Sequence, residues 1–393
     1  MGNVPHLRFP EFSGEWKKCK FGDIATGFDY GMNAAAKPFD GENKYIRITD
    51  IDEASSQYLY DDVVSPDGEL GDSYLVKEND ILLARTGAST GKSYLYRNSD
   101  GKLYFAGFLI RANIYKHNSY FVFSQLHTHR YKKWISVMSA RSGQPGINSQ
   151  EYASFPLYTT SLQEEDKIAS FLKLLDERIA TQNKIIDKFQ SLIKGLIDDI
   201  ITLKCGQLVA FETLYSKAGE GGTPTTSNTE FYDNGSIPFI KIDDLSNKYL
   251  SANKDYITEL GLKKSSAWLI PTHSIIYSNG ATIGAISINK YPVCTKQGIL
   301  GIVPNTNIDV EFLYYFMQSS YFQKEVERVV TEGTMKTAYL KDINHIKCPI
   351  PDLDRQKEIS HLLSVLSLKE DVERQLLQKY KIQKQYLLRK MFI

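Results

Sequence analysis

The sequence predicts an α+β protein in which one mixed α/β domain occurs twice, with a long helix after each copy and an internal pseudo-two-fold symmetry. The first observation is an internal repeat. YIRITDI (45–51) matches FIKIDDL (239–245), and GASTG (87–91) matches GATIG (280–284). Together with four further matches, these pairs follow one order along the chain at offsets of 190 to 194 residues. Such a constant offset indicates a duplicated structural unit.

The second observation is a change of composition inside each copy. Residues 14–156 and 206–349 contain short alternating apolar runs broken by turn residues, which predicts a domain built around short strands. Residues 163–203 and 354–392 hold a single glycine and no proline, and acidic residues stand near their start, so each predicts one long helix. We therefore divide the chain into a first domain (1–156), a central helical spacer (157–205), a second domain (206–350) and a distal helical spacer (351–393).

The first predicted helix carries an apolar seam with alternating steps of four and three residues. This heptad spacing predicts a coiled-coil helix, roughly 60 Å long for some 40 residues. The second helix keeps the same phase less regularly, which suggests that it partly faces something other than its twin. A plain spacer of two packed helices is the alternative, and the sequence leaves it open. The seam consists of Ile168, Leu172, Leu175, Ile179, Ile186, Phe189, Ile193, Leu196 and Ile200 in the first helix, with Leu363, Leu366, Leu377, Tyr380, Leu387 and Met391 in the second.

The composition excludes several classes of protein. Of the 393 residues 42% are apolar, and 47 basic residues balance 46 acidic ones, which argues against a disordered chain or a polycation. We find no apolar run of 18 residues and no secretory signal, so we expect a cytoplasmic protein without a membrane partner. The four cysteines lie too far apart for a CxxC motif and suggest no disulfide framework.

No motif indicates catalysis. GASTGKS (87–93) resembles a phosphate-binding loop, but it has three residues between its glycines instead of four, and Ala285 replaces Lys92 in the second copy. We therefore predict a glycine-supported turn. His127 and His129 stand two residues apart in a predicted helix, so they point to different faces and make a poor metal pair. We expect no catalytic residue, no metal site and no cofactor bound by this chain.

The distribution of charge favours nucleic-acid binding by the first copy. Residues 29–80 carry 13 acidic and 4 basic residues, whereas residues 81–150 carry 10 basic residues against Asp100 alone. Eleven aromatic residues are interleaved with these basic residues. A concentrated positive field with aromatic residues is typical of a nucleic-acid-binding face. The alternative is that the basic residues are scattered over the domain surface, and residues 275–340 of the second copy are balanced at five against five.

Several motifs resemble those of the specificity subunits of type I restriction–modification systems. They are the opening LRFPEFSGEW (7–16), GGTP (221–224) before IPFIKIDDL (237–245), the GAxxG turns, and a proline leading into the QEEDKI and RQKEI helix starts. The resemblance covers essentially the whole chain, including the duplication. The first copy departs from it, because it has GFDYGMNAAAKP (27–38) instead of GGTP.

The resemblance implies two target-recognition domains, each recognising one half of a split, asymmetric site on double-stranded DNA. It also implies two long helices that pack antiparallel and bind two DNA adenine methylation subunits, with restriction and translocation subunits in the full complex. S-adenosylmethionine, ATP and Mg would then be bound by the partner subunits, and this chain would be non-catalytic. Two alternatives stay open: the recognition subunit of a multisubunit type II restriction enzyme, and a coiled-coil scaffold with two protein-binding heads.

Base-contacting side chains are expected to be polar or basic residues on loops that reach the major groove. In the first domain we select Arg85, Ser89, Lys92, Arg141, Gln144 and Asn148, and in the second Asn279, Thr282, Lys296, Gln297, Lys336 and Tyr339. For the partner-binding helices we select Ile168, Leu172, Leu175, Ile179, Ile186, Leu363, Leu366 and Leu377. The spacer helices are expected to set the number of unread base pairs between the two half-sites.

Overall fold

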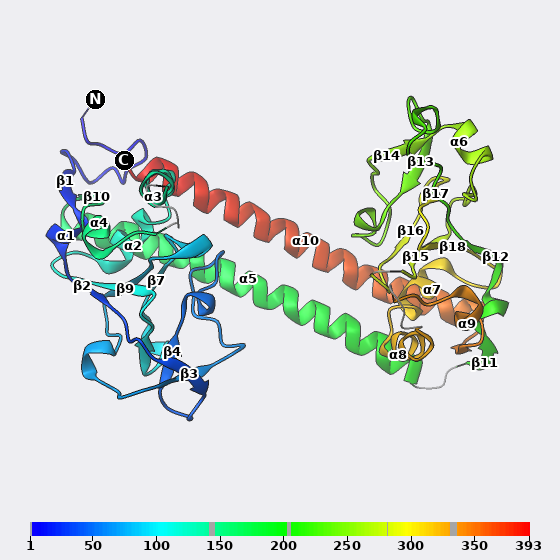
Figure 1. Cartoon of the computed structure of the whole chain (residues 1–393), viewed down its shortest axis with the longest axis horizontal. Coiled ribbons are helices and arrows are strands. Elements are labelled where there is room, and N and C mark those ends of the chain that lie inside the picture. Colours follow the sequence, from blue (N-terminus) through cyan, green and yellow to red (C-terminus); the bar gives the residue numbers. More distant parts are fainter. Residues whose placement is uncertain (1, 141–145, 203–205, 281, 331–335) are drawn as a thin grey trace. The chain divides into compact units, whose positions relative to one another are not determined.

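The computed structural model describes residues 2–140, 146–202, 206–280, 282–330 and 336–393, without the side chains of 201 and 202 (Figure 1). The chain divides into two compact units, which we call unit 1 (Met1–Asn183 with Leu376–Ile393) and unit 2 (Lys184–Gln375). Each unit contains one copy of the repeat together with parts of both long helices, α5 (Leu162–Thr202) and α10 (Leu353–Met391).

Unit 1 is built around an antiparallel four-stranded sheet with strand order β2-β9-β6-β7. Three smaller strand pairs accompany it: β1 with β10 and β3 with β5, both antiparallel, and β4 with β8, which is parallel. The elements before α5 are β1 (Lys17–Lys20), α1 (Phe21–Ile24), β2 (Ala25–Tyr30), β3 (Ala35–Pro38), β4 (Lys44–Ile46), η1 (Ile48–Asp50), β5 (Val64–Asp67), η2 (Asp72–Tyr74), β6 (Asp80–Ala84), η3 (Gly87–Ser89), β7 (Ser93–Leu95), η4 (Asn98–Asp100), β8 (Leu103–Phe105), β9 (Leu109–Ile114), α2 (Ser119–Gln125), α3 (His129–Ser139), α4 (Ser149–Ala153) and β10 (Pro156–Thr159).

Unit 2 repeats this arrangement with the strand order β12-β18-β15-β16. Its smaller sheets pair β11 with β19 and β13 with both β14 and β17. The elements after α5 are β11 (Gln207–Ala210), η5 (Phe211–Leu214), β12 (Tyr215–Glu220), η6 (Thr229–Phe231), β13 (Ile237–Ile240), η7 (Ile242–Asp244), β14 (Asp255–Ile257), α6 (Glu259–Lys263), β15 (Ile275–Ser278), β16 (Ile286–Ile288), β17 (Cys294–Thr295), β18 (Ile299–Pro304), α7 (Val310–Phe316), α8 (Ser320–Val329), α9 (Leu340–Ile343) and β19 (Lys347–Ile350).

The strand register confirms the predicted repeat. In unit 1 Ile81 of β6 pairs with Ala112 of β9, and in unit 2 Ile275 of β15 pairs with Ile302 of β18. Ile275 lies 194 residues after Ile81, and Ile302 lies 190 residues after Ala112, so both offsets fall within the range of 190 to 194 found for the sequence matches. A register shared in this way means that the two copies place equivalent side chains on equivalent faces of the sheet.

The long helices contribute to the apolar core of each unit. In unit 1, Ile168 and Leu172 of α5 join Leu387 and Met391 of α10 in one buried cluster with the sheet and α2. In unit 2, Ile197 of α5 joins α10 residues in the corresponding cluster with α7 and α8. The strands and short helices of each unit, which we call its head, therefore pack directly on both long helices. Strand β10 runs across the predicted boundary after residue 156 because its strand partner is β1.

The two helices run antiparallel within unit 1, as the resemblance implies. Asp176 of α5 pairs with Lys384 of α10 at 2.6 Å, and Arg178 Nε donates to Tyr380 Oη at 2.7 Å. Because the residue numbers rise along α5 while they fall along α10, the helices point in opposite directions. Among the described residues, no helix is long and apolar enough to span a membrane.

The predicted seam is only partly a helix–helix interface. Ile168, Leu172 and Leu363 are each 1% exposed because they pack into the heads, while Leu175, Ile179, Leu366 and Leu377 are half-buried and Ile186 is buried. The selection of Ile168, Leu172 and Leu363 as partner-binding residues must therefore be corrected, because these side chains lie in the cores of the two units. Heptad spacing identifies the buried face of a helix but not what covers it. The exposed apolar residues of the two helices are instead Leu162, Phe171, Leu174, Leu192, Leu362, Val365, Leu368, Val372, Ile382 and Tyr386.

Candidate nucleic-acid interface

Three chain segments meet in unit 1 where β6 ends. The backbone N–H of Arg85 donates to the carbonyl of Phe108 in the β8–β9 turn at 3.1 Å. The Arg85 carbonyl in turn accepts from Ile147 N at 2.9 Å, and Thr86 forms an isolated bridge with Gly146. The three segments thus present their side chains at one edge of the sheet.

Arg85 is held in one orientation at this edge. Its guanidinium lies 4.8 Å above the ring of Tyr30, and its buried Nε has no hydrogen-bond partner among the described residues. Tyr30 is itself fixed by a hydrogen bond from Ser149 N at 3.3 Å, which lowers the pKa of the phenol. A planar guanidinium stacked on an aromatic ring is suited to bidentate contact with base acceptors.

The turn from Gly87 to Lys92 packs on α3 and is the predicted glycine-supported turn. Gly87 and Gly91 have φ angles of 70° and 94°, and a Cβ on Gly91 would lie 2.8 Å from Ile135. Ser89 and Lys92 are half-buried on this turn, and the Lys92 ammonium lies 3.8 Å from the Glu53 carboxylate. The turn therefore brings both selected residues near Arg85.

The structure gives less support for a base contact by the other selected residues of the first domain. Asn148 caps α4, because its side chain accepts from Glu151 N at 2.9 Å while its own N–H donates to Glu151 at 2.8 Å. A base contact by Asn148 stays a prediction and would have to use its remaining amide N–H groups. Arg141 and Gln144 lie outside the described residues.

The same convergence of loops occurs in unit 2. Asn279 N donates to the carbonyl of Gly298 at 3.1 Å, and Ala338 N donates to the Asn279 carbonyl at 2.9 Å. A Cβ on Gly280 would lie 3.4 Å from the Gly298 backbone, so the β15–β16 and β17–β18 turns approach closely. The fold thus gathers the selected residues of the second domain, which the sequence spreads over some sixty positions, on three adjoining segments.

Most of these residues are accessible, but Asn279 is not. Thr282, Lys296, Gln297, Lys336 and Tyr339 are all exposed. Asn279 is 1% exposed, and its Nδ2 donates to the Ala338 carbonyl at 3.1 Å. Its selection as a base-contacting residue is corrected accordingly: a polar side chain at a meeting point of loops is used to satisfy backbone groups.

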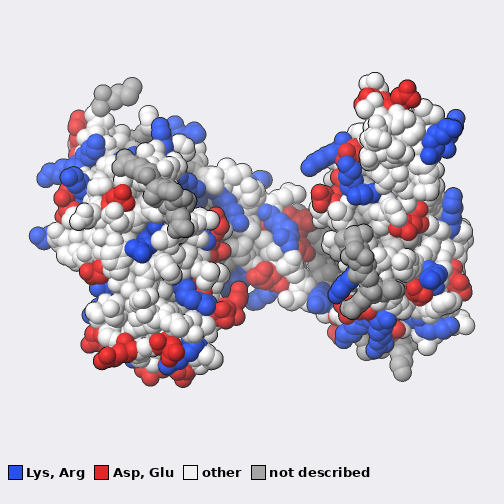
Figure 2. All heavy atoms as spheres, in the orientation of Figure 1, with Lys and Arg blue, Asp and Glu red and all other residues white. Residues whose placement is uncertain are grey.

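The described basic residues of segment 81–150 are interspersed with acidic ones. Its residues fold against the acidic segment 29–80, so that Lys102 pairs with Glu42 at 3.1 Å and Arg111 with Asp29 at 2.9 Å. Arg130 lies 4.6 Å from the ring of Tyr158, and burial lowers its pKa. Figure 2 accordingly shows Lys and Arg interspersed with Asp and Glu over the visible face of each unit.

Two exposed aromatic residues at the edge of unit 1 were not among the residues selected from the sequence. Tyr30 is 42% exposed beneath Arg85, and Phe108 is 60% exposed in the β8–β9 turn. Tyr30 belongs to the segment 27–38 in which the first copy departs from the GGTP motif of the second. That difference between the copies was the available signal, because loops that recognise different ligands differ in sequence.

Residues 13–190 and 215–381 match the model of the type I restriction modification DNA specificity domain. The chain belongs to this family. The two matched specificity domains correspond to the two copies of the repeat, and each includes the converging loops of one unit.

Named relatives share this assignment. The type I restriction enzyme EcoR124I/EcoR124II specificity subunit of Escherichia coli is 28% identical over 200 residues, which are 46% of this chain and 49% of that protein. The chain thus spans about half the length of that relative. The MjaVIII specificity subunit of Methanocaldococcus jannaschii is 22% identical over 389 residues, which cover 91% of this chain and 86% of the relative.

Solved structures share the fold. The type I restriction–modification S subunit from M. genitalium has a TM-score of 0.60 at 15% identity, and the alignment covers 99% of both chains. A chain from a study of complex assembly and conformational transition of the type I R-M system has the same TM-score and coverage at 14% identity. Both matches include the pair of specificity domains and the long helices.

Proposed function

We propose that this chain is the non-catalytic DNA-recognition subunit of a type I restriction–modification complex, in which each specificity domain recognises one half of a bipartite target. The observation that carries the proposal is the pair of specificity domains, each of which gathers polar loop residues at the same edge of an equivalent sheet. Because the loops of the two domains differ in sequence, the two half-sites differ and the target is asymmetric.

In the first domain Arg85 is the principal base-contacting residue. Its guanidinium lies against the Tyr30 ring at 4.8 Å, and the N–H donors of a guanidinium match the O6 and N7 acceptors of guanine in the major groove. Ser89 and Lys92 on the adjoining turn contribute a further polar contact and a phosphate contact. A good bidentate pair discriminates against a wrong base by about 1–3 kcal/mol.

In the second domain the exposed residues of the three adjoining segments contact the other half-site. Lys296 and Gln297 on the β17–β18 turn and Thr282 on the β15–β16 turn supply donors and acceptors for base edges. Lys336 and Tyr339 flank Ala338, whose backbone is bonded to Asn279, and they contact the backbone of the duplex. Asn279 positions these segments and does not touch the DNA.

Two DNA adenine methylation subunits bind the long helices in this proposal, and restriction subunits join them in the full complex in the cytoplasm. S-adenosylmethionine, ATP and Mg are bound by those subunits. The exposed apolar residues of α5 and α10, such as Leu174 and Leu368, each 65% exposed, support a protein contact on the outer helix faces. The names of the relatives favour a type I complex over a type II enzyme, and the family match favours DNA recognition over a scaffold with two protein-binding heads.

The test is single-molecule sequencing of methylated adenines in cells that express this chain with its neighbouring methylation subunit. We expect a new two-part motif with a fixed gap, absent from cells that express either protein alone. The variant Arg85→Ala should relax one half-site and leave the other unchanged. An equal loss of sequence discrimination at both half-sites would contradict the proposal that each domain recognises one half-site. The absence of any methylated motif, with both proteins assembled, would contradict the proposal as a whole.

A further inference from the structure

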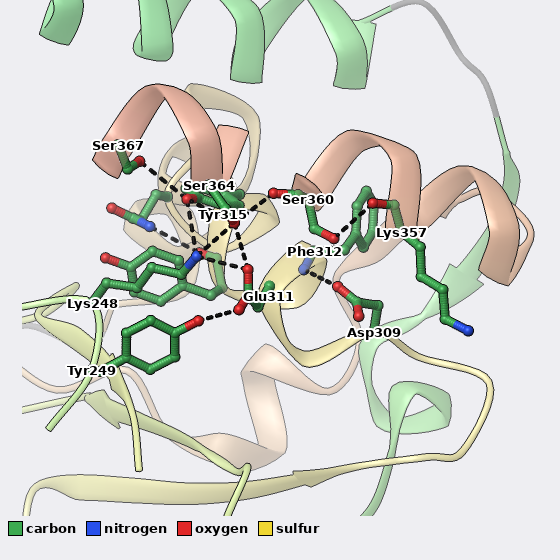
Figure 3. Close-up of polar contacts among 12 residues, drawn as sticks. Lys248, Tyr249, Asp309, Glu311, Phe312, Tyr315, Lys357, Ser360, Ser364 and Ser367 are labelled. Atoms are coloured by element: carbon green, nitrogen blue, oxygen red, sulfur yellow. Dashed lines mark hydrogen bonds and ion pairs between the residues drawn. The ribbon is translucent and has the colours of Figure 1, made fainter. Parts of the chain in front are cut away.

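A partly buried polar cluster in unit 2 joins the recognition domain to α10. We call it the helix seat, and its residues are Lys248, Tyr249, Glu311, Tyr315, Ser364 and Ser367 (Figure 3). Lys248 Nζ donates to Glu311 Oε2 at 2.8 Å, to Tyr315 Oη at 3.1 Å and to Ser364 Oγ at 2.8 Å. All three hydrogen bonds of one ammonium therefore go to α7 and α10.

The remaining members of the helix seat close the network. Glu311 accepts hydrogen bonds from Tyr249 Oη and from Ser364 Oγ, the latter at 2.5 Å. Tyr315 Oη lies 3.1 Å from Ser367 Oγ, one helical turn further along α10. The Lys248 and Glu311 side chains are 16% and 28% exposed, so their hydrogen bonds are only partly in competition with water.

The helix seat differs in kind from the apolar contacts between this recognition domain and α10. Ile359 and Leu363 of α10 pack against apolar residues of α7 and α8. Such contacts are non-directional and tolerate small shifts of one surface over the other. Hydrogen bonds to an ammonium depend on distance and angle, and sliding α10 by one residue would displace Ser364 by about 1.5 Å and rotate it by about 100°. Directional hydrogen bonds therefore specify a single position of the helix: those of the helix seat, and those of Gln356 of α10, which accepts from Asp309 N at 2.8 Å and donates to the Asn307 carbonyl at 3.2 Å.

The helix seat is also linked to the DNA-binding edge. The Lys248 carbonyl accepts a hydrogen bond from Ile288 N of β16 at 2.7 Å. Strand β16 pairs with β15, which leads into the turn that carries Thr282. A path of hydrogen bonds therefore runs from the Ser364 side chain of α10 through the Lys248 side chain and its backbone carbonyl to the sheet that positions the base-contacting turns.

Unit 1 has a polar cluster at the corresponding place, built from different residues. Tyr120 of α2 donates to Asp176 of α5, and Asp176 pairs with Lys384 of α10 at 2.6 Å. Tyr120 and Asp176 precede Glu311 and Ser367 by the same 191 residues, an offset within the range of the repeat. In unit 1 the cation comes from the second helix, whereas in unit 2 it comes from the recognition domain itself. Lys248 thus links the second domain to α10 in a cluster whose counterpart in unit 1 takes its cation from the helix.

We propose that the helix seat fixes the position of the second recognition domain along α10 and thereby sets the number of base pairs between the two half-sites, with Lys248 as a positioning residue. This inference rests on the proposed function. One base pair advances the duplex by about 3.4 Å, little more than two residues of an α-helix. A head that can occupy neighbouring positions on α10 would therefore accept neighbouring gap lengths.

The experiment measures methylation by the complete complex on duplexes that contain both half-sites with the natural gap or with one base pair more or fewer. Wild type should strongly prefer the natural gap. Lys248→Met should raise the relative rate on the altered gaps by about tenfold or more, the scale expected for lost hydrogen bonds to a charged group. The bases recognised in each half-site should be unchanged. Lys290→Met is the matched control, since its ammonium lies 4.3 Å from the Tyr249 ring but makes no hydrogen bond to the helix seat among the described residues, and it should retain the wild-type profile.

A wild-type gap profile in an assembled Lys248→Met complex would overturn the inference. If Lys248→Met does not assemble, Ser364→Ala decides, because it removes two hydrogen bonds of the helix seat without leaving a longer side chain to accommodate. A Ser364→Ala complex with unchanged gap preference would equally overturn it. If wild type itself methylates no bipartite site, the proposed function fails and the inference falls with it, which distinguishes the two failures.

Discussion

Replacing Arg8 should lower the free energy of unfolding of unit 1 by more than the loss of an exposed ion pair would. Arg8 Nε and Nη2 donate to the two carboxylate oxygens of Glu164 at 2.7 and 2.8 Å, in a bidentate pair. The side chains of Arg8 and Glu164 are 12% and 1% exposed. The pair joins the N-terminal segment to the first turn of α5, so its loss affects the packing of the head on its helix.

The magnitude follows from what Arg8→Ala leaves behind. Removing one partner of a buried pair costs about 3–5 kcal/mol, because the other charge stays buried without compensation. Glu164 would still accept hydrogen bonds from Thr160 Oγ1 at 2.5 Å and Trp16 Nε1 at 3.3 Å, which favours the lower end, about 3 kcal/mol. The double variant Arg8→Met with Glu164→Gln should regain most of this loss, because it buries no charge.

The assay is denaturant unfolding followed by tryptophan fluorescence, with Trp16 and Trp134 in unit 1 and Trp268 in unit 2. Lys167→Ala is the matched control, because it breaks an ion pair with Glu11 in which both side chains are more than 40% exposed. It should cost much less than Arg8→Ala, because both charges stay in contact with water. A loss below 1 kcal/mol in Arg8→Ala, or a double variant no more stable than the single one, would refute the reasoning.

The same pair determines a pH dependence. Burial raises the pKa of Glu164, but the hydrogen bonds from Arg8 and Thr160 outweigh burial and the net pKa is lowered. A carboxyl group whose pKa is lower in the folded state stabilises the fold above its unfolded pKa, and the contribution is lost as the pH falls through the folded value. Unfolding free energies measured between pH 3 and 7 should therefore fall less steeply toward acid in Arg8→Ala than in wild type.

Three further outcomes are expected. Arg85→Ala should reduce discrimination at one position of one half-site by about 1–3 kcal/mol, measured as relative methylation of matched and mismatched duplexes, and a comparable loss in the other half-site would contradict the assignment. Burial, and to a smaller extent the charge of Lys384, lower the pKa of His127 to about 4. The free energy of unfolding should therefore decline as the pH falls from about 6.5 toward 4, and His127→Gln should remove that decline in thermal unfolding. Inserting one heptad between Ile186 and Phe189 of α5, and one at the facing level of α10, adds about 10 Å to each helix. The gap in the methylated motif should then lengthen by about three base pairs, with both half-sites unchanged. A change in the half-sites themselves would contradict the idea that helix length sets the gap.

The sequence alone determined the duplicated architecture and both long helices. The predicted helices at 163–203 and 354–392 differ by one residue at each end from α5 and α10. The reason is that periodicity, the loss of glycine and proline, and an internal repeat are properties of the linear chain. Lys296 and Gln297, selected as polar loop residues, are exposed, and their contact with bases stays a prediction.

Only the tertiary structure decided which of these side chains are free to act. Asn279 and Lys296 are equivalent choices in sequence, yet the first is buried against Ala338 and the second is exposed. Arg111 belongs to a strongly basic segment but pairs with Asp29, and Ile168 belongs to a heptad seam but packs into the head. Lys248, an ordinary lysine in sequence, meets Glu311 and Ser364 from positions 63 and 116 residues away. Burial and pairing depend on contacts between residues distant along the chain, and those contacts exist only when both domains have folded on their helices.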